Sequence, residues 1–160
     1  MAILKIVNEK GKYQDANATE DVLGYIFNPS KSNYNLYGYF RVDPTNPTKS
    51  MREVAASFGK SKGIQLRHYV ISFPPYEVAN PIVVAQIADE VVKYFTSSYQ
   101  TVYAIHEDTT CLHIHLVCNT INFRTGERYR GSKKEYYDFI TFLRRLLRKF
   151  GVNCLIIEHK

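Results

Sequence analysis

The segment from residue 101 to residue 121 constrains the fold of this chain more than any other. Within it, apolar residues occupy every second position from Leu112 to Cys118, and the positions between them carry His113, His115, Val117 and Asn119, the period of a β-strand with two different faces. A second strand pattern over residues 101–107 precedes it, and the short connection predicts a hairpin that turns at Thr109-Thr110. A chain with such a hairpin must pair antiparallel strands and bury the apolar face of the resulting sheet.

Further strand and helix patterns flank the hairpin. Hairpins mixed with long helices predict an α+β fold, with a central antiparallel β-sheet and helices packed on it. No repeat, low-complexity segment or long linker divides the 160 residues, so we expect a single domain over residues 1–160. Strands are expected over residues 2–8, 35–42, 65–73 and 152–157, and helices over residues 19–27 with Thr19 as N-cap, 48–58, 81–95 and 135–150.

The composition is that of an ordinary globular protein, with 45% hydrophobic and 22% charged residues. No stretch approaches the roughly 18 consecutive apolar residues of a membrane-spanning helix. The first eight residues lack the apolar segment of a signal peptide. Three scattered cysteines are too few for a disulfide framework. We therefore expect a reduced, cytoplasmic protein without membrane insertion.

Three histidines are expected to converge on one face of the hairpin. If the chain turns at Thr109-Thr110, His106 lies directly opposite His113, and His115 follows on the same, solvent-facing side. Asp108 shares that face and is expected to orient a ligating histidine. Three neutral imidazoles form a metal site with open coordination positions, which suits catalysis. By ligand softness alone, such a site favours Zn²⁺, Ni²⁺ or Cu²⁺.

The positive charge of the chain is concentrated near its end. Between residues 124 and 149 there are nine basic residues against three acidic ones, an excess equal to the net charge of +6 of the whole chain. Three tyrosines are interleaved with them, and aromatic faces beside cations are typical of sites for single-stranded nucleic acid. A solvated helix face is the other interpretation. The expected DNA-binding residues are Arg124, Arg128, Arg130, Lys133 and Lys134.

Three sequence blocks together resemble a known family. The run His106-x-Asp108-x-x-x-Leu112-His113-x-His115-x-x-x-Asn119 resembles the histidine motif of the plasmid relaxases of the MobA/VirD2 type, which usually have proline where this chain has leucine. Residues 68–75 resemble the second motif of that family, which implies that Ser72 contacts DNA near the cleaved phosphate. Residues 23–31 resemble the first motif, which implies that Tyr25 is the nucleophile.

The resemblance implies a His-hydrophobe-His nuclease fold and metal-dependent, site- and strand-specific DNA nicking and rejoining. Tyr25 would attack a backbone phosphate and form a 5′-phosphotyrosine, which conserves the phosphodiester energy for resealing. The three histidines would hold Mg²⁺ or Mn²⁺, with Asn119 as a further site or DNA-contacting residue. The implied partners are single-stranded DNA at the transfer origin of a plasmid or mobile element, accessory mobilisation proteins and a type IV secretion coupling protein. Family members are generally longer, so the chain is either a minimal protein or a nuclease core.

Two alternatives stay open at this level. Rolling-circle replication initiators and small transposases share the His-hydrophobe-His motif but carry their nucleophile on a later helix, where this chain has Tyr136 and Tyr137. A non-cleaving origin-binding protein would keep the fold and the metal. We expect Tyr136 to belong to the core and His68 to be structural or DNA-facing, and Asn119 has the alternative of bonding a backbone group.

Overall fold

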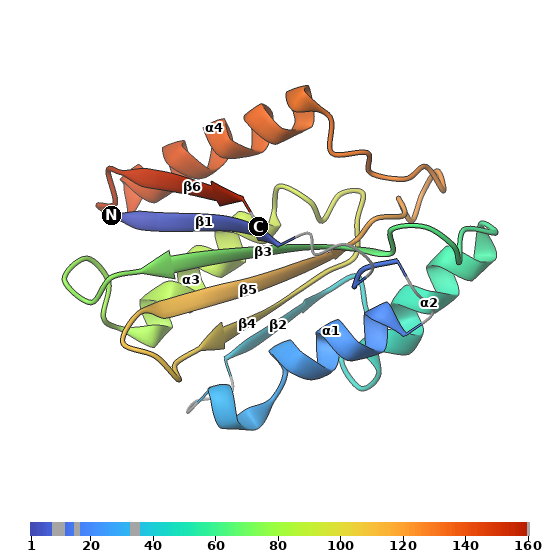
Figure 1. The fold of residues 1–160 in the computed structure, drawn as a ribbon, viewed down its shortest axis with the longest axis horizontal. Helices are drawn as coiled ribbons and strands as arrows, with labels where there is room; N and C mark the ends of the chain where they lie inside the picture. The colour runs from blue at the N-terminus through green and yellow to red at the C-terminus, as the bar shows by residue number, and fades with distance from the viewer. Residues whose placement is uncertain (8–11, 15–16, 33–35, 160) are drawn as a thin grey trace.

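A computed structural model describes residues 1–7, 12–14, 17–32 and 36–159 (Figure 1). These residues form one six-stranded sheet in the order β2-β4-β5-β3-β1-β6, together with four α-helices and a short 3-10 helix, η1. The predicted α+β class is confirmed. The strands are β1 (Ala2–Val7), β2 (Tyr37–Phe40), β3 (Leu66–Phe73), β4 (Thr101–His106), β5 (Leu112–Asn119) and β6 (Leu155–His159). The helices are α1 (Ala18–Ile26), η1 (Pro29–Lys31), α2 (Pro47–Ser57), α3 (Pro81–Val92) and α4 (Lys133–Lys149).

Element boundaries differ from the prediction at a few ends. The N-cap of α1 is Asn17, whereas Thr19 is buried in the first turn of that helix. Helix α3 ends at Val92, three residues before the predicted end at Phe95. Phe95 is nevertheless buried in the core, so its apolar character reflects burial and not helical structure. Asn8 and Asn35, which the sequence predicts at strand ends, lie outside the described residues.

The sheet is mixed rather than wholly antiparallel. Four pairings are antiparallel, and β1 pairs with β6 in parallel. The reason is visible in Figure 1: α4 carries the chain back along the sheet, so β6 runs in the same direction as β5 and β1. Hydrophobic patterns identify the strands, but a crossover of this kind depends on where a helix docks.

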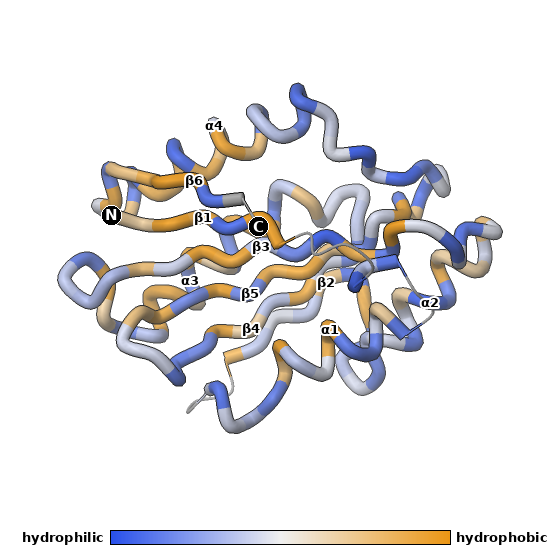
Figure 2. The backbone as a smooth tube through the Cα atoms, in the orientation of Figure 1, coloured by the Kyte–Doolittle hydropathy of each residue, from blue (hydrophilic) through white to orange (hydrophobic). Residues whose placement is uncertain are grey.

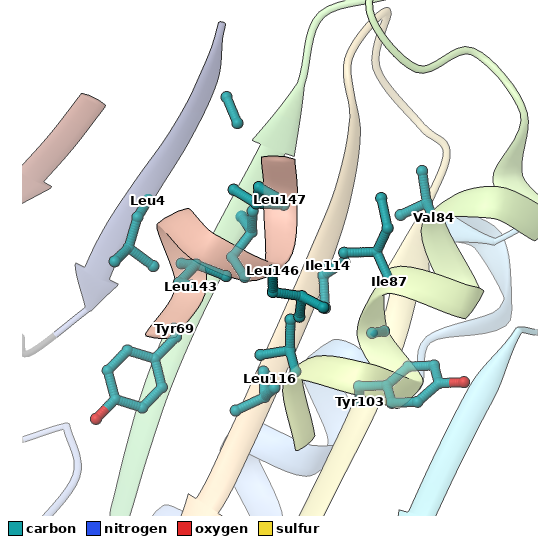
Figure 3. Packing of buried hydrophobic residues seen from close by; sticks show 14 of the residues in the cluster. Leu4, Tyr69, Val84, Ile87, Tyr103, Ile114, Leu116, Leu143, Leu146 and Leu147 are labelled. Atoms are coloured by element: carbon teal, nitrogen blue, oxygen red, sulfur yellow. The ribbon is translucent and has the colours of Figure 1, made fainter. Parts of the chain in front are cut away.

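The main core lies between the sheet and the helices α3 and α4. Ile114 and Leu116 of β5 point into it, as the alternation predicts, and meet Ile87 of α3 and Leu143 and Leu146 of α4 (Figure 3). Each of these side chains is nearly or fully buried, which contributes roughly 1.5–3 kcal/mol per residue relative to exposure. This face of the sheet therefore supplies most of the apolar burial.

A smaller core lies on the opposite face of the sheet, under α1. Val22, Leu23 and Ile26 of α1 pack there with Val102 of β4 and Val117 of β5. Figure 2 shows the hydrophobic residues following the central strands, while hydrophilic residues gather in the connection between β5 and α4. Among the described residues, no helix combines the length and apolarity needed to cross a bilayer.

Candidate active site

The three predicted histidines meet on the α1 side of the sheet. His106 pairs directly with His113 across the β4–β5 ladder, as the predicted register requires, and His115 follows two residues later. The ring centroids of His106 and His115 are 4.0 Å apart, and those of His113 and His115 are 5.1 Å apart. One nitrogen from each ring lies within 4.8 Å of the others, a spacing at which all three can reach one metal ion.

Two of the three histidines are buried and His113 is partly buried, although the sequence predicts that the cluster faces solvent. His106 is 0% exposed and His115 is 5% exposed, because the end of α1 covers them. The Nε2 atom of His106 donates a hydrogen bond of 2.8 Å to the carbonyl of Ile26, the last residue of α1. That carbonyl has no partner within its own helix, so the histidine both satisfies the helix end and fixes its own ring.

Hydrogen bonds to backbone carbonyls define the tautomers of His106 and His113. A carbonyl oxygen only accepts, so the protons lie on Nε2 of His106, bonded to Ile26, and on Nδ1 of His113, bonded to the Cys111 carbonyl at 2.9 Å. The remaining nitrogens, Nδ1 of His106 and Nε2 of His113, therefore carry lone pairs. Backbone acceptors of this kind orient metal-ligating histidines in proteins.

His115 is oriented by side chains that the sequence does not connect with it. Its Nδ1 lies 2.8 Å from Nε2 of His68, and the Nδ1 of His68 lies 2.9 Å from the Tyr13 hydroxyl. With the proton of His115 on Nδ1, His68 accepts it and donates its own proton to Tyr13. The alternation of β3 places His68 on the site face, but nothing in the sequence indicates that Tyr13 reaches it.

Burial keeps these imidazoles neutral. Desolvation lowers the pKa of His68 to about 3 and lowers the pKa of His115 further, with a smaller contribution from neighbouring imidazoles. Desolvation also lowers the pKa of His106. A neutral imidazole is the form that binds a metal ion, so the site is prepared for a ligand at neutral pH.

The donor set fits a divalent metal ion. Among the described residues, Nδ1 of His106 and Nε2 of His115 are buried without any hydrogen-bond partner. Leaving two buried acceptors unsatisfied is costly, and a metal ion that takes up both lone pairs removes that cost. His106, His113 and His115 are therefore the residues that would hold the ion, with coordination positions left for a substrate oxygen.

Tyr25 lies at the rim of this cluster. Its ring is 47% exposed and makes edge contacts with the rings of His106 and His115, at centroid distances of 5.8 and 5.6 Å. The Nζ atom of Lys31, on η1, lies 5.2 Å from the centre of the Tyr25 ring and 3.1 Å from Oδ2 of Asp108. The hydrogen bond that Lys31 donates to Asp108 raises the pKa of Lys31, so this cation is retained beside the tyrosine.

Ser72 and Asp108 lie near His113, but the carbonyl of Cys111, and not Asp108 as the sequence predicts, orients this ring by a hydrogen bond. Ser72 pairs with His113 across β3 and β5, and Oδ1 of Asp108 is 3.8 Å from Nε2 of His113. Ser72 and His113 line an open groove of about 380 Å³, together with Tyr25 and His115. Two cations that the sequence analysis does not single out, Lys5 and Lys12, also line it. The groove therefore brings cations, a serine hydroxyl, the histidines and Tyr25 together.

Asn119 does not belong to the groove, contrary to prediction. It shares the face of His113 and His115 but lies at the far end of β5, and it is 2% exposed. Its amide donates to the Met51 carbonyl at 3.1 Å and to Gln100 at 2.9 Å, and its oxygen accepts from the Ile121 amide. The side-chain nitrogen and oxygen of Asn119 both bond to groups inside the protein. Asn119 therefore has the role that the sequence analysis gives as its alternative, which is to bond a backbone group.

The expected basic patch is separate from the groove. Residues 124–134 follow the end of β5 that is remote from His113. Arg128 forms hydrogen bonds within the protein, because its guanidinium donates to the carbonyls of Lys60 and Lys62 at 3.0 and 2.6 Å. Lys134 pairs with Asp138 at 2.6 Å, whereas Arg124, Arg130 and Lys133 are exposed.

The tyrosines of α4 lie on the wrong side of the sheet to act at the histidine cluster. Helix α4 packs on the face that carries Ile114 and Leu116, opposite the imidazoles. Tyr136 is partly buried against that core, as predicted, and Tyr137 is 62% exposed. The initiator-type arrangement, with a nucleophile on this helix, does not match the fold.

Comparisons with known proteins agree with one another. The family model described as "Relaxase: MobA/VirD2-like, nuclease domain" matches residues 25–152. Two curated proteins of Staphylococcus aureus, each named "Protein rlx", are 34% identical over 89 residues and 31% identical over 90 residues. These alignments cover 56% of this chain and 27% and 26% of the relatives, so the chain spans about a quarter of their length.

A solved structure has the same fold. It comes from the work titled "Molecular Basis of Vancomycin Resistance Transfer in Staphylococcus aureus" and superposes with a TM-score of 0.53 over 78% of this chain and 72% of that chain. The sequence identity is 13%, so the likeness concerns the fold alone.

Proposed function

This chain belongs to the MobA/VirD2-like relaxase nuclease domains, and from that membership we propose that it nicks and rejoins single-stranded DNA at a transfer origin through Tyr25. The observation that carries the proposal is the contact of the exposed Tyr25 ring with the rings of His106 and His115, whose free nitrogens lack any other partner among the described residues. A tyrosine beside a metal site is an arrangement suited to phosphodiester transesterification.

Tyr25 is the proposed nucleophile. Its hydroxyl oxygen forms a bond to the phosphorus of the scissile phosphodiester while the bond from phosphorus to the 3′ oxygen breaks. The phenolic proton leaves to solvent, and the departing 3′ oxygen gains a proton. The product is a 5′-phosphotyrosine and a free 3′-hydroxyl, and the reverse reaction reseals the strand. Lys31, held by Asp108 beside the ring, places a positive charge where the negative phosphate approaches Tyr25.

The remaining groove residues bind and orient the strand. Lys5 and Lys12 attract the phosphate backbone, and the Ser72 hydroxyl is available to a phosphate oxygen next to the scissile group. A divalent ion held by the three histidines would neutralise charge on the scissile phosphate, and hard Mg²⁺ or Mn²⁺ suits a phosphate oxygen. The fixed tautomers of the histidines keep their lone pairs directed at that ion.

The proposal predicts a covalent adduct that depends on Tyr25. The protein is incubated with Mn²⁺ and labelled single-stranded oligonucleotides drawn from candidate transfer origins. A slowly migrating species on a denaturing gel, mapped by peptide mass to Tyr25, is the expected result. Tyr25→Phe should abolish the adduct, because it removes the attacking oxygen and keeps the ring that contacts the histidines. The melting temperature of the variant should stay within a few degrees of the wild type.

Tyr137→Phe is the matched control, since it removes one exposed tyrosine hydroxyl on the opposite face of the sheet. It should form the adduct at the wild-type rate. An adduct that survives Tyr25→Phe, or that maps to Tyr136 or Tyr137, would contradict the assignment. Tight, salt-sensitive binding of the correct origin without an adduct in any divalent metal would indicate the non-cleaving alternative.

A further inference from the structure

A second cavity lies on the face of the sheet opposite the histidines, beneath the first turns of α4. It holds about 180 Å³ and is formed mainly by aromatic rings around one arginine. Its principal lining residues are Arg67 and Tyr69 of β3, Tyr129 and Gly131 of the following connection, and Tyr136 and Phe139 of α4. None of these residues takes part in the proposed reaction.

Arg67 carries more hydrogen-bond donors than the protein satisfies. Its Nη2 reaches the Tyr129 carbonyl at 3.5 Å, and its Nε is buried with no partner among the described residues. The guanidinium lies 5.5 Å from the centre of the Tyr129 ring, and within the described chain no carboxylate pairs with it. A half-buried guanidinium without a counter-ion is costly unless a ligand supplies acceptors.

Gly131 keeps the cavity open. Its φ of +68° lies in the left-handed region, and a Cβ at this position would come within 2.7 Å of Nη2 of Arg67. Any larger residue would therefore strain the backbone and displace the guanidinium. The site thus depends on a particular backbone shape as well as on side-chain chemistry.

We propose that this cavity binds one unpaired nucleobase of single-stranded DNA, with the base stacked on the tyrosine rings and its acceptor edge bonded to Arg67. Aromatic rings stack on bases of any sequence, and an arginine is the preferred partner of the O6 and N7 acceptors of guanine. The exposed cations Arg130 and Lys133 stand next to Gly131 in the chain, where they serve the phosphates on either side of such a base. This inference rests on the proposed function, because it takes the DNA strand to be the substrate.

The pocket and the histidine cluster are close neighbours through the sheet. Arg67 and His68 are adjacent on β3, and successive residues of a strand point to opposite faces. A base held by Arg67 is therefore outside the reacting groove, and the pocket contributes affinity without touching the scissile phosphate. Loss of the pocket should weaken binding and leave the chemical step unchanged.

The test compares Arg67→Gln with Arg145→Gln, which removes the same charge from an exposed position on α4. Fluorescence anisotropy with a labelled, unstructured 20-nucleotide single strand containing guanine measures the affinity. Arg67→Gln should weaken binding about tenfold, and Arg145→Gln less than twofold. Equal affinities of the two variants would overturn the proposal. If Arg67→Gln does not fold, Tyr136→Leu removes a stacking wall instead and should also weaken binding severalfold.

An abasic strand of the same length separates a base from a phosphate ligand. The wild type should bind it about as weakly as Arg67→Gln binds the normal strand, and Arg67→Gln should cause no further loss. If Arg67→Gln weakens the binding of both strands equally, the guanidinium contacts phosphate and the base assignment is wrong.

The adduct assay distinguishes failure of this inference from failure of the proposed function. At saturating DNA, Arg145→Gln, which lies outside the pocket, should form the Tyr25 adduct at the wild-type rate. Binding that depends on Arg67 in a protein that forms no adduct would refute the nicking function and keep the base pocket. If the adduct forms but DNA affinity does not depend on Arg67, the base pocket is refuted and the nicking function is kept.

Discussion

In each histidine of the cluster, one ring nitrogen donates a hydrogen bond to an acceptor outside the cluster, and the other ring nitrogen faces the other two histidines. For His106 and His113 the acceptor is a backbone carbonyl, but for His115 it is the side chain of His68. A carbonyl belongs to the backbone and persists through substitution, whereas an imidazole can be replaced. His115 is therefore the ligand whose orientation is open to a direct mutational test.

His68→Leu should weaken metal binding roughly 10–100-fold, because it removes the acceptor that keeps the proton of His115 on Nδ1. His68→Gln places a carbonyl oxygen near the same position and should retain most of the affinity. Titration calorimetry with Mn²⁺ and Zn²⁺, on samples checked by circular dichroism, measures both variants. Equal affinities for His68→Leu and the wild type would show that His68 does not orient the ligand.

At the level of elements, both the strand that carries the site and helix α1 could be predicted, but the docking of α1 over the histidines could not. Alternation along β5 is a local property, so the pairing of His106 with His113 and the inward direction of Ile114 follow from the sequence. The position of α1 depends on side-chain packing between residues distant in sequence. For that reason the burial of the histidines, and the bond to the Ile26 carbonyl, appear only in the structure.

Two glycines, Gly24 in α1 and Gly151 after α4, allow the effect of backbone conformation on stability to be tested. Gly24 lies in the interior of α1, exposed, and a Cβ there would meet nothing within 4 Å. Gly151 follows α4 with equally open surroundings, but its φ is +81°. Gly24→Ala should stabilise the protein by about 0.5–1 kcal/mol, and Gly151→Ala should destabilise it by about 1–2 kcal/mol.

Urea denaturation measures both free energies of unfolding. A loss of stability in Gly24→Ala would mean that this residue is not in regular helix. If Gly24→Ala is more stable but binds single-stranded DNA less well, the strand approaches the backbone of α1 next to Tyr25.

At the scale of the whole molecule, the two faces of the sheet respond differently to pH. The α3–α4 face buries a large apolar core, whereas the α1 face buries three imidazoles whose pKa values are lowered by desolvation. In the unfolded chain the same histidines have their ordinary pKa near 6.5. Above that pH these histidines are neutral in both the folded and the unfolded state. Below it they bind protons in the unfolded state but stay neutral in the folded state.

The metal-free protein should therefore lose stability as the pH falls below 6.5. His68, with a pKa of about 3, contributes a loss of about 1.4 kcal/mol per pH unit between those values. Urea denaturation in the presence of a chelator, at pH 7.5, 6.5 and 5.5, measures the trend. His68→Gln should have a correspondingly smaller slope, and equal slopes would mean that His68 is not kept neutral by the fold.

Strict alternation along β5 also limits how the length of this chain can vary. Adding or removing one residue within the strand would exchange its imidazoles with its leucines and isoleucines, losing the site and the core together. The connection from residue 107 to residue 111 carries no such alternation, but its length is tied to the pairing of His106 with His113 and to the contact of Asp108 with Lys31. In alignments of related chains, gaps should therefore be absent from β5.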